Sequence, residues 1–362
     1  MASAASLFDL QIPPAQIAQH PLAERDRSRL MVVQRGAPGY SHHRFDDLPA
    51  LLPPGCLLVR NNTRVLPARL EGRLPSGREC EALLTEEVAP GRWYAMVLGA
   101  RKVKPGDRLS FAGGALAAAA VARGPAGTWL LDFDEPGALR ERLHRHGLAP
   151  LPPYVKRNGN AAQHRDWYQT CYARIEGSIA APTAGFHFTP GVFEGLRARG
   201  IDWVELTLHV GIGTFLPIEN QDLERHHMHR ERFILPPETC QAVRSARERG
   251  RPVIAVGTTT VRALESWAQK GLPEGHEGWT ELFIGPPYEF RAVDGLITNF
   301  HQPASTLIRL VAALHGEELV RAAYEEAIAR DYRFFSYGDA MAILPGRSRE
   351  TWEPLLDSGK ER

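Results

Sequence analysis

The sequence predicts an α/β main domain, with a mixed, partly barrel-like sheet and flanking helices, that carries an inserted small antiparallel β-barrel. Two observations support this prediction. Short segments separated by Pro/Gly turns fill residues 67–147, whereas helices and strands alternate after residue 148. At 362 residues the chain also has room for about two domains. We therefore expect a discontinuous main domain at 1–66 and 148–362, with the barrel domain inserted at 67–147.

The first elements follow from local patterns. Apolar runs at 30–33 and 56–59 predict two buried strands. Within 67–147, short apolar segments bounded by Pro and Gly are typical of barrel strands, and the alanine-rich run 115–122 is expected to be a strand because glycines flank it. A helix at 136–147 then leads out of the insertion, with glycine at its end.

The rest of the chain alternates helices with strands. Proline near the start and glycine at the end support helices at 190–200 and 236–250. Further helices are expected at 258–271, 305–316 and 316–331, and strands at 202–210, 252–257, 280–285 and 295–300.

Composition and charge exclude few functions. Lys plus Arg is 43 and Asp plus Glu is 42, so the net charge is +1 and only local patches can argue for a nucleic-acid partner. The four cysteines are scattered, which is typical of free thiols in a reducing compartment. The N-terminus lacks the features of a signal peptide, and no apolar run approaches the roughly 18 residues of a membrane span. We expect a cytoplasmic protein without membrane contact.

Threonines follow the apolar strand at 252–257. Thr258, Thr259 and Thr260 open the next helix, and Arg262 lies in its first turn. Hydroxyls and free backbone N–H groups at a helix N-terminus suit an anion such as a phosphate or carboxylate. Plain capping by threonine explains the same residues, so this stretch alone leaves both readings open.

Two histidines lie beside small residues. His209 ends a predicted strand and is followed by Gly211 and Gly213, which allow a sharp turn or a close approach to a ligand. His187 stands between Phe186 and Phe188, and strand-like alternation would place it on the opposite face from the two rings. A core histidine is the ordinary interpretation of such a position, although the small residues before it favour a cleft.

Further polar residues lie at strand and helix ends. Asn299 and His301 end the predicted strand 295–300, and Ser305 opens the next helix. Asp339 closes an aromatic stretch that contains Arg333 and could stack on bases. Arg64 belongs to an arginine cluster near the start of the insertion, which could follow a phosphate backbone or face solvent.

The stretch ERHHMHRERF at 224–233 carries His226, His227, His229 and Glu231. Nearby histidines could bind zinc, or they could transfer protons near neutral pH. The local sequence does not decide between a metal site and an acid–base site.

Taken together, the motifs resemble the S-adenosylmethionine:tRNA ribosyltransferase-isomerases of queuosine biosynthesis. The matches run in order from about residue 9 to 343: RDRSRLMVV, NNTRVLPARLEG, LPPYVKR, YQTCYA, AAPTAGFHF, LHVGIGTFLPI, HHMHRERF, AVGTTTVRALES, TNFHQPASTLIRLV and YRFFSYGDAM. The departures are mild, such as Phe186 where the family pattern has leucine. The barrel segment matches in pattern rather than in residues.

The resemblance implies an unusual reaction. The ribosyl part of S-adenosylmethionine, used as a co-substrate without a metal, would be moved onto 7-aminomethyl-7-deazaguanine at the tRNA wobble position. Rearrangement would give epoxyqueuosine-tRNA, with release of adenine and methionine. The partner would be tRNA that bears this base in its anticodon, with the base splayed into a pocket and the barrel as a candidate RNA contact. No protein partner is evident, and a monomer is compatible with the sequence.

The resemblance also suggests roles for individual residues. A proton must leave the carbon beside the sulfonium, so one of His187, His209 and His229 would be the base, with Glu231 orienting a histidine or receiving the substrate amine. Thr258–Thr260 and Arg262 would hold the methionine carboxylate, and Asn299 and Asp339 would contact base edges. The expected substrate-binding residues are Thr183, Gly211, Gly213, Thr258, Thr259, Thr260, Arg262, Asn299, His301, Ser305, Asp339 and Arg64.

Other classes stay open on the residues alone. His209, His226 and His229 would serve a metal-dependent hydrolase, and the barrel with its arginine patches would serve an RNA-binding protein without turnover. The glycine turn at 211–213 would suit a methyltransferase.

Overall fold

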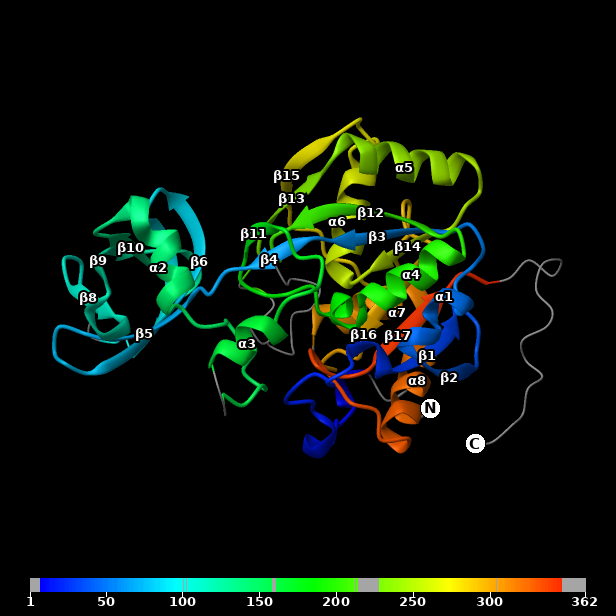
Figure 1. Ribbon diagram of the computed structural model, residues 1–362, viewed down its shortest axis with the longest axis horizontal. Helices are drawn as coiled ribbons and strands as arrows, with labels where there is room; N and C mark the ends of the chain where they lie inside the picture. Colours follow the sequence, from blue (N-terminus) through cyan, green and yellow to red (C-terminus); the bar gives the residue numbers. More distant parts are fainter. Residues whose placement is uncertain are drawn as a thin grey trace.

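The computed structural model describes residues 7–99, 101, 103–157, 161–211, 213, 228–303 and 305–346. In this part of the chain, a large mixed sheet with flanking helices forms one body and a closed antiparallel barrel forms the other (Figure 1). The predicted fold class is confirmed. The boundaries proposed for the two domains stay predictions.

The large sheet has nine strands within the described residues, and parallel and antiparallel neighbours are mixed in it. Its order is β15 (His276–Thr280), β13 (Glu231–Leu235), β12 (Asp202–Leu208), β3 (Leu57–Asn61), β14 (Val253–Val256), β16 (Gly295–Asn299), β17 (Ala340–Leu344), β1 (Arg29–Gln34) and β2 (Tyr40–Arg44). The strands β12, β3, β14 and β16 pair in parallel. The early apolar runs form β1 and β3, as predicted.

Both faces of the sheet are covered. Along β14, Val253 and Ala255 enter one hydrophobic core while Ile254 and Val256 enter another, because side chains alternate across a strand. This is why β14 is apolar throughout rather than alternating. The first core is closed by α5 (Pro237–Glu248), α6 (Thr258–Gln269), α7 (Thr306–His315) and α8 (Glu317–Ala329), and the second by α1 (Leu48–Leu51) and α4 (Pro190–Ala198).

The barrel has its own core. Its strands follow the order β10 (Trp129–Phe133), β7 (Arg92–Leu98), β6 (Glu79–Ala89), β5 (Arg69–Arg73), β8 (Arg108–Phe111) and β9 (Leu116–Arg123), with α2 (Leu139–His146) beside them. The alanine-rich run lies in β9, as predicted. Its small side chains Ala118 and Ala120 pack in the same core as the large rings of Phe111 and Trp129.

The chain enters and leaves the barrel at neighbouring positions. The backbone N–H of Leu148 donates to Arg69 O at 2.8 Å, and Arg69 N–H donates to Leu148 O at 3.2 Å. Between the two bodies lie β4 (Thr63–Val65) and β11 (Ile175–Ser178), which pair in parallel, and α3 (Ala161–Trp167) (Figure 1).

Some sequence expectations are wrong. The strand expected at 280–285 is absent, because β15 ends at Thr280. The backbone of Leu282 is instead satisfied by side chains, since its N–H donates to Thr280 Oγ1 at 3.1 Å and its carbonyl accepts from Arg262 Nε at 3.0 Å. Strand alternation does not apply at His187 either, because Thr183–His187 form a 3-10 turn.

Candidate functional site

A cavity opens beside the carboxyl ends of β14 and β16, which are parallel neighbours. In open α/β sheets such strand ends are the usual place for ligands. Its empty space, with the open mouth included, is about 1260 Å³. The sequence-predicted residues that line it are Thr183, Gly213, His229, Glu231, Thr258, Thr259, Arg262, Asn299, His301 and Ser305.

One side of the cavity holds a buried ion pair. Glu231, the first residue of β13, forms an ion pair with Arg262 Nη1 from α6. Glu231 is 4% exposed and Arg262 is 5% exposed. The second carboxylate oxygen accepts from the Gly211 N–H at 2.9 Å. Arg262 also donates from Nε to Leu282 O, but its buried Nη2 has no hydrogen-bond partner among the described residues. Because an unpaired buried donor is costly, this nitrogen is suited to receive a ligand anion.

The N-terminus of α6 faces the same space. Its cap is Gly257, which has a φ of 87° that disfavours any other residue. Thr258 and Thr259 line the cavity, and their backbone N–H groups have no acceptor among the described residues. Thr260 does not reach the cavity, because its hydroxyl donates back to Val256 O at 2.6 Å. We call His229, Glu231, Arg262 and this helix start the charged wall.

A second group of polar residues at the cavity is neutral, and its members are hydrogen-bonded in series. Ser28 Oγ lies 2.7 Å from His187 Nδ1, Asn299 Nδ2 lies 3.2 Å from His187 Nε2, and Thr183 donates to Asn299 Oδ1 at 2.9 Å. Burial lowers the pKa of His187 to about 4, so the ring is neutral and its Nε2 accepts from Asn299. We call Ser28, His187, Asn299 and Thr183 the neutral wall.

His187 itself does not line the cavity. Its ring stacks on Phe45, with 5.0 Å between centroids, and only Asn299 and Thr183 of the neutral wall reach the cavity. The histidine therefore fixes the Asn299 amide from behind.

His209 also lies outside the cavity lining. Its Nδ1 is 2.8 Å from Thr63 Oγ1, and its ring fills the space where a side chain at Gly177 would stand. Burial, together with the smaller effect of the Arg232 and Arg140 charges, lowers its pKa to about 4. Of the three predicted histidines, only His229 lines the cavity. Gly213 lies against it, since a Cβ there would be 3.1 Å from His229 Cδ2.

His301 and Ser305 line the cavity but are also engaged within the fold. His301 Nε2 lies 2.7 Å from Thr298 Oγ1, and burial lowers the pKa of His301 to about 4. Ser305 caps α7, accepting from Ile308 N–H at 3.4 Å.

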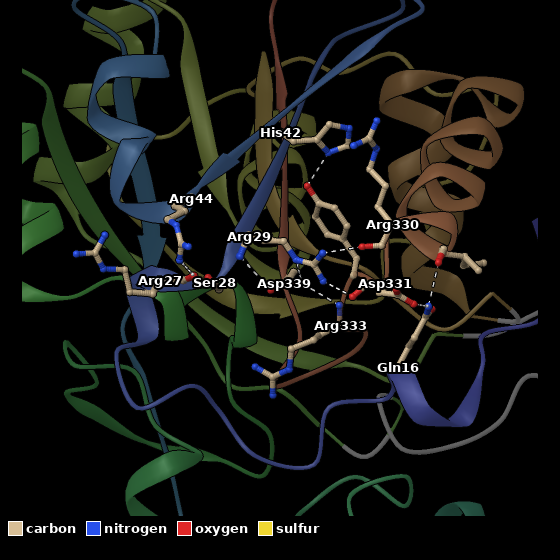
Figure 2. A network of polar contacts seen from close by, with 12 residues as sticks. Gln16, Arg27, Ser28, Arg29, His42, Arg44, Arg330, Asp331, Arg333 and Asp339 are labelled. Atoms are coloured by element: carbon tan, nitrogen blue, oxygen red, sulfur yellow. Dashed lines mark hydrogen bonds and ion pairs between the residues drawn. The ribbon is translucent and has the colours of Figure 1, made fainter. Parts of the chain in front are cut away.

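Asp339 and Arg64 are placed elsewhere. Figure 2 shows Asp339 within a polar network, where its carboxylate accepts from the backbone N–H groups of Arg29 and Arg333 and from Arg29 Nε, at 2.8 to 3.2 Å. This geometry favours a structural role for Asp339, and its predicted contact with a base stays a prediction. Arg64 is exposed on β4 and does not line the cavity.

Three aromatic residues line the cavity: Tyr154, Tyr168 and Phe335. Phe335 lies in the aromatic stretch that was expected to stack on bases, whereas sequence reasoning missed Tyr154 and Tyr168. The Tyr154 hydroxyl bonds Ser336 at 2.6 Å. The rings of Tyr154 and Phe335 lie 4.8 Å apart. The tyrosine after Pro152-Pro153 was a usable signal, because an aromatic ring held by a rigid proline turn is suited to stack on a base.

The structure describes only some of the histidines that were considered as metal ligands. His226 and His227 lie outside the described residues. Among those described, no group of three or more His, Cys, Asp or Glu side chains is placed to hold a metal ion. No helix in the described ranges is both long and apolar enough to cross a membrane.

The fold and cavity define a class of protein: an α/β enzyme with an inserted barrel, whose site combines a helix start suited to an anion, an accessible histidine and an amide held by a neutral histidine. The chain belongs to the family of queuosine biosynthesis proteins, whose family model matches residues 5–343.

Similar proteins carry one name. A Thermotoga maritima protein called S-adenosylmethionine:tRNA ribosyltransferase-isomerase is 47% identical over 340 residues, covering 94% of this chain and 99% of that protein. One of the same name from Symbiobacterium thermophilum is 46% identical, covering 93% and 98%. The crystal structure of S-adenosylmethionine tRNA ribosyltransferase from Thermotoga maritima matches with a TM-score of 0.55 and 39% identity, covering 94% of this chain and all of that one.

Proposed function

We propose that this enzyme transfers and isomerises the ribosyl moiety of S-adenosylmethionine onto 7-aminomethyl-7-deazaguanine at the wobble position of tRNA. The products are epoxyqueuosine-tRNA, adenine and methionine. The names of its relatives support the reaction class. The observation that carries the proposal is the cavity itself, which is lined by an arginine with an unpartnered nitrogen among the described residues, a helix start and an accessible histidine.

The charged wall suits the methionine end of S-adenosylmethionine. Its carboxylate would accept from Arg262 Nη2 and from the backbone N–H groups of Thr258 and Thr259, where the helix dipole adds attraction. Glu231 already neutralises Arg262, so the wall binds a zwitterion without adding a large net charge to the site. Glu231 also offers an acceptor to the substrate amine.

His229 is the proposed general base. Among His187, His209 and His229, it alone lines the cavity, and a base must reach the proton that it removes. Here that proton is on the ribose carbon beside the sulfonium, whose positive charge makes it acidic. His187 and His209 are assigned positioning roles instead, since each is buried behind the cavity surface.

The neutral wall suits a heterocycle. The Asn299 amide, oriented by His187 and Thr183, presents a donor and an acceptor to the edge of a base, while Tyr154 and Phe335 offer stacking surfaces. The wobble base of an anticodon loop is single-stranded, so splaying it into the cavity costs little.

The deciding experiment uses chelator-treated protein with S-adenosylmethionine and tRNA that carries the aminomethyl-deazaguanine. Adenine release together with an epoxycyclopentane-bearing nucleoside, identified by mass, is the expected result. Activity that returns only with added zinc would favour the metal-dependent alternative. Absence of product under both conditions, with tRNA still bound, would overturn the proposed function in favour of a binding protein.

A further inference from the structure

A second, smaller hollow lies behind His187. It is bounded by Arg25, Ser28, Arg333, Ser336 and Tyr337 among others, and its empty space with the open mouth is about 240 Å³. Ser336 also lines the large cavity, so the two hollows share one residue as a partition. Beyond its mouth, this recess admits little more than a group the size of one water molecule.

Two residues that line the recess carry buried hydrogen-bond donors without a partner among the described residues. The Tyr337 hydroxyl has no hydrogen-bond partner among the described residues, and the tyrosine is 3% exposed. Arg333 Nη1 is likewise buried and unpartnered within the same part of the chain. Leaving such groups unpaired is unfavourable. Because both belong to residues that line one small hollow, we infer that something outside this chain satisfies them.

The charge around the recess favours an anion. Neither Arg25 nor Arg333 forms an ion pair with a carboxylate in the described residues. Arg25 instead donates to the carbonyls of residues 166, 167 and 169 at 2.7 to 3.1 Å. Both guanidinium charges lower the pKa of neighbouring His187, which is a separate sign that a positive field reaches this space.

The recess also opens toward a basic groove. Leu22 and Arg333 line both the recess and this groove. The groove is also lined by Arg27, Arg29, Arg44 and Arg330. In Figure 2 the guanidinium of Arg333 extends away from Asp339, which is bound by the backbone N–H of Arg333. Arg29 is compensated by Asp339, and Arg27 and Arg330 by other carboxylates, whereas Arg44 has no carboxylate partner in the described residues.

We propose that the mouth of the recess receives a phosphodiester group of the tRNA next to the nucleotide inserted in the cavity. One phosphate oxygen enters the recess and accepts from Arg333 Nη1 and the Tyr337 hydroxyl. The basic groove then receives the backbone that leads away from it. Phosphate contacts of this kind fix register and orientation, which is what a single splayed nucleotide requires. This inference rests on the proposed function, because it assumes that the cavity holds a tRNA nucleotide.

The test compares Tyr337→Phe and Arg333→Gln with Arg249→Gln, an exposed arginine just past the end of α5. Steady-state KM is measured for tRNA and for S-adenosylmethionine, and tRNA dissociation constants are measured against salt concentration. Tyr337→Phe should raise KM and Kd for tRNA by about 5–10-fold, and Arg333→Gln by more. Arg333→Gln should also reduce the salt slope by about 0.7, the value of one contact to a single strand. KM for S-adenosylmethionine should stay the same, and Arg249→Gln should match wild type throughout.

The outcomes separate the two proposals. If wild-type protein gives no product, the proposed function fails whatever the variants do. If wild type is active and Tyr337→Phe keeps its tRNA KM and Kd, the recess holds only an ordered water and the phosphate proposal is overturned. A rise in KM for S-adenosylmethionine alone would assign the recess to the methionine carboxylate and would equally overturn it. Thermal unfolding of Tyr337→Phe should match wild type, because the lost hydroxyl has no hydrogen-bond partner in the described part of the chain.

Discussion

The charged wall and the neutral wall solve the same problem, burial of polar groups beside a ligand, in different ways. On the charged wall Glu231 and Arg262 form an ion pair in which each side chain compensates the other, and the Gly211 N–H donates to the other carboxylate oxygen. On the neutral wall burial removes the charge of His187, and the hydrogen bonds pass through neutral groups from Ser28 to Thr183.

The difference shows how one cavity can bind two kinds of chemical group. A paired arginine with a vacant nitrogen can receive a carboxylate, whereas an amide oriented by a neutral imidazole can recognise the edge of a base. The difference also predicts that substitutions on the two walls have different effects. A change on the charged wall leaves a buried charge or removes the base, while a change on the neutral wall alters orientation and pH dependence.

The largest expected effect comes from His229→Ala. Turnover should fall by about 10²–10⁴-fold, because a general base in contact with substrate contributes that much. Adenine release under saturating substrates measures the loss, with His276→Ala on β15, away from the cavity lining, as the control. If His229→Ala retains more than half of wild-type turnover, the base lies elsewhere.

The next effect is on stability. Arg262→Leu should lower the free energy of unfolding by about 3–5 kcal/mol, because it leaves the Glu231 carboxylate buried without its partner. The double variant with Glu231→Leu should recover most of that stability but none of the affinity for S-adenosylmethionine. Urea unfolding and ligand titration measure the two quantities. Equal destabilisation in the single and double variants would contradict the coupling.

A smaller effect is expected from His187 through pH. Its folded pKa of about 4 lies below the ordinary 6.5, so the folded state binds fewer protons between these values. Stability should therefore fall as the pH drops from 6.5 toward 4, and His187 alone contributes roughly 2 kcal/mol of the loss between pH 7 and pH 5. Urea unfolding at both pH values should show a loss that is smaller by this amount in His187→Gln. An unchanged pH dependence would mean that folding does not lower the pKa of His187.

The smallest effect is expected from Thr183→Val. It removes the donor to Asn299 Oδ1 and should cost about 1 kcal/mol of stability. A KM for tRNA that rises while KM for S-adenosylmethionine stays constant would support a base-orienting role for Asn299. The reverse pattern would assign this wall to the methionine end instead.

The sequence was informative where local pattern decides structure. Barrel strands bounded by Pro/Gly turns, the apolar strand β14 and the threonines that follow it are set by neighbours within a few residues, so their positions were predictable. The strand expected after Thr280 is absent, and at Leu282 side chains replace strand partners: Thr280 accepts from its N–H and Arg262 donates to its carbonyl. The resemblance to a family supplied the candidate residues, but not their arrangement.

By itself the sequence determined which residue types would gather at the strand ends, because apolar periodicity, proline and glycine mark where strands and helices begin and end. The tertiary structure decided which histidine faces the cavity. His187 is held by Ser28 from 159 residues away, and His209 by Thr63 from 146 residues away. Such partners depend on how the sheet brings distant segments together, so no local pattern encodes them. The same holds for the Tyr337 hydroxyl, which has no hydrogen-bond partner among the residues that the structure describes.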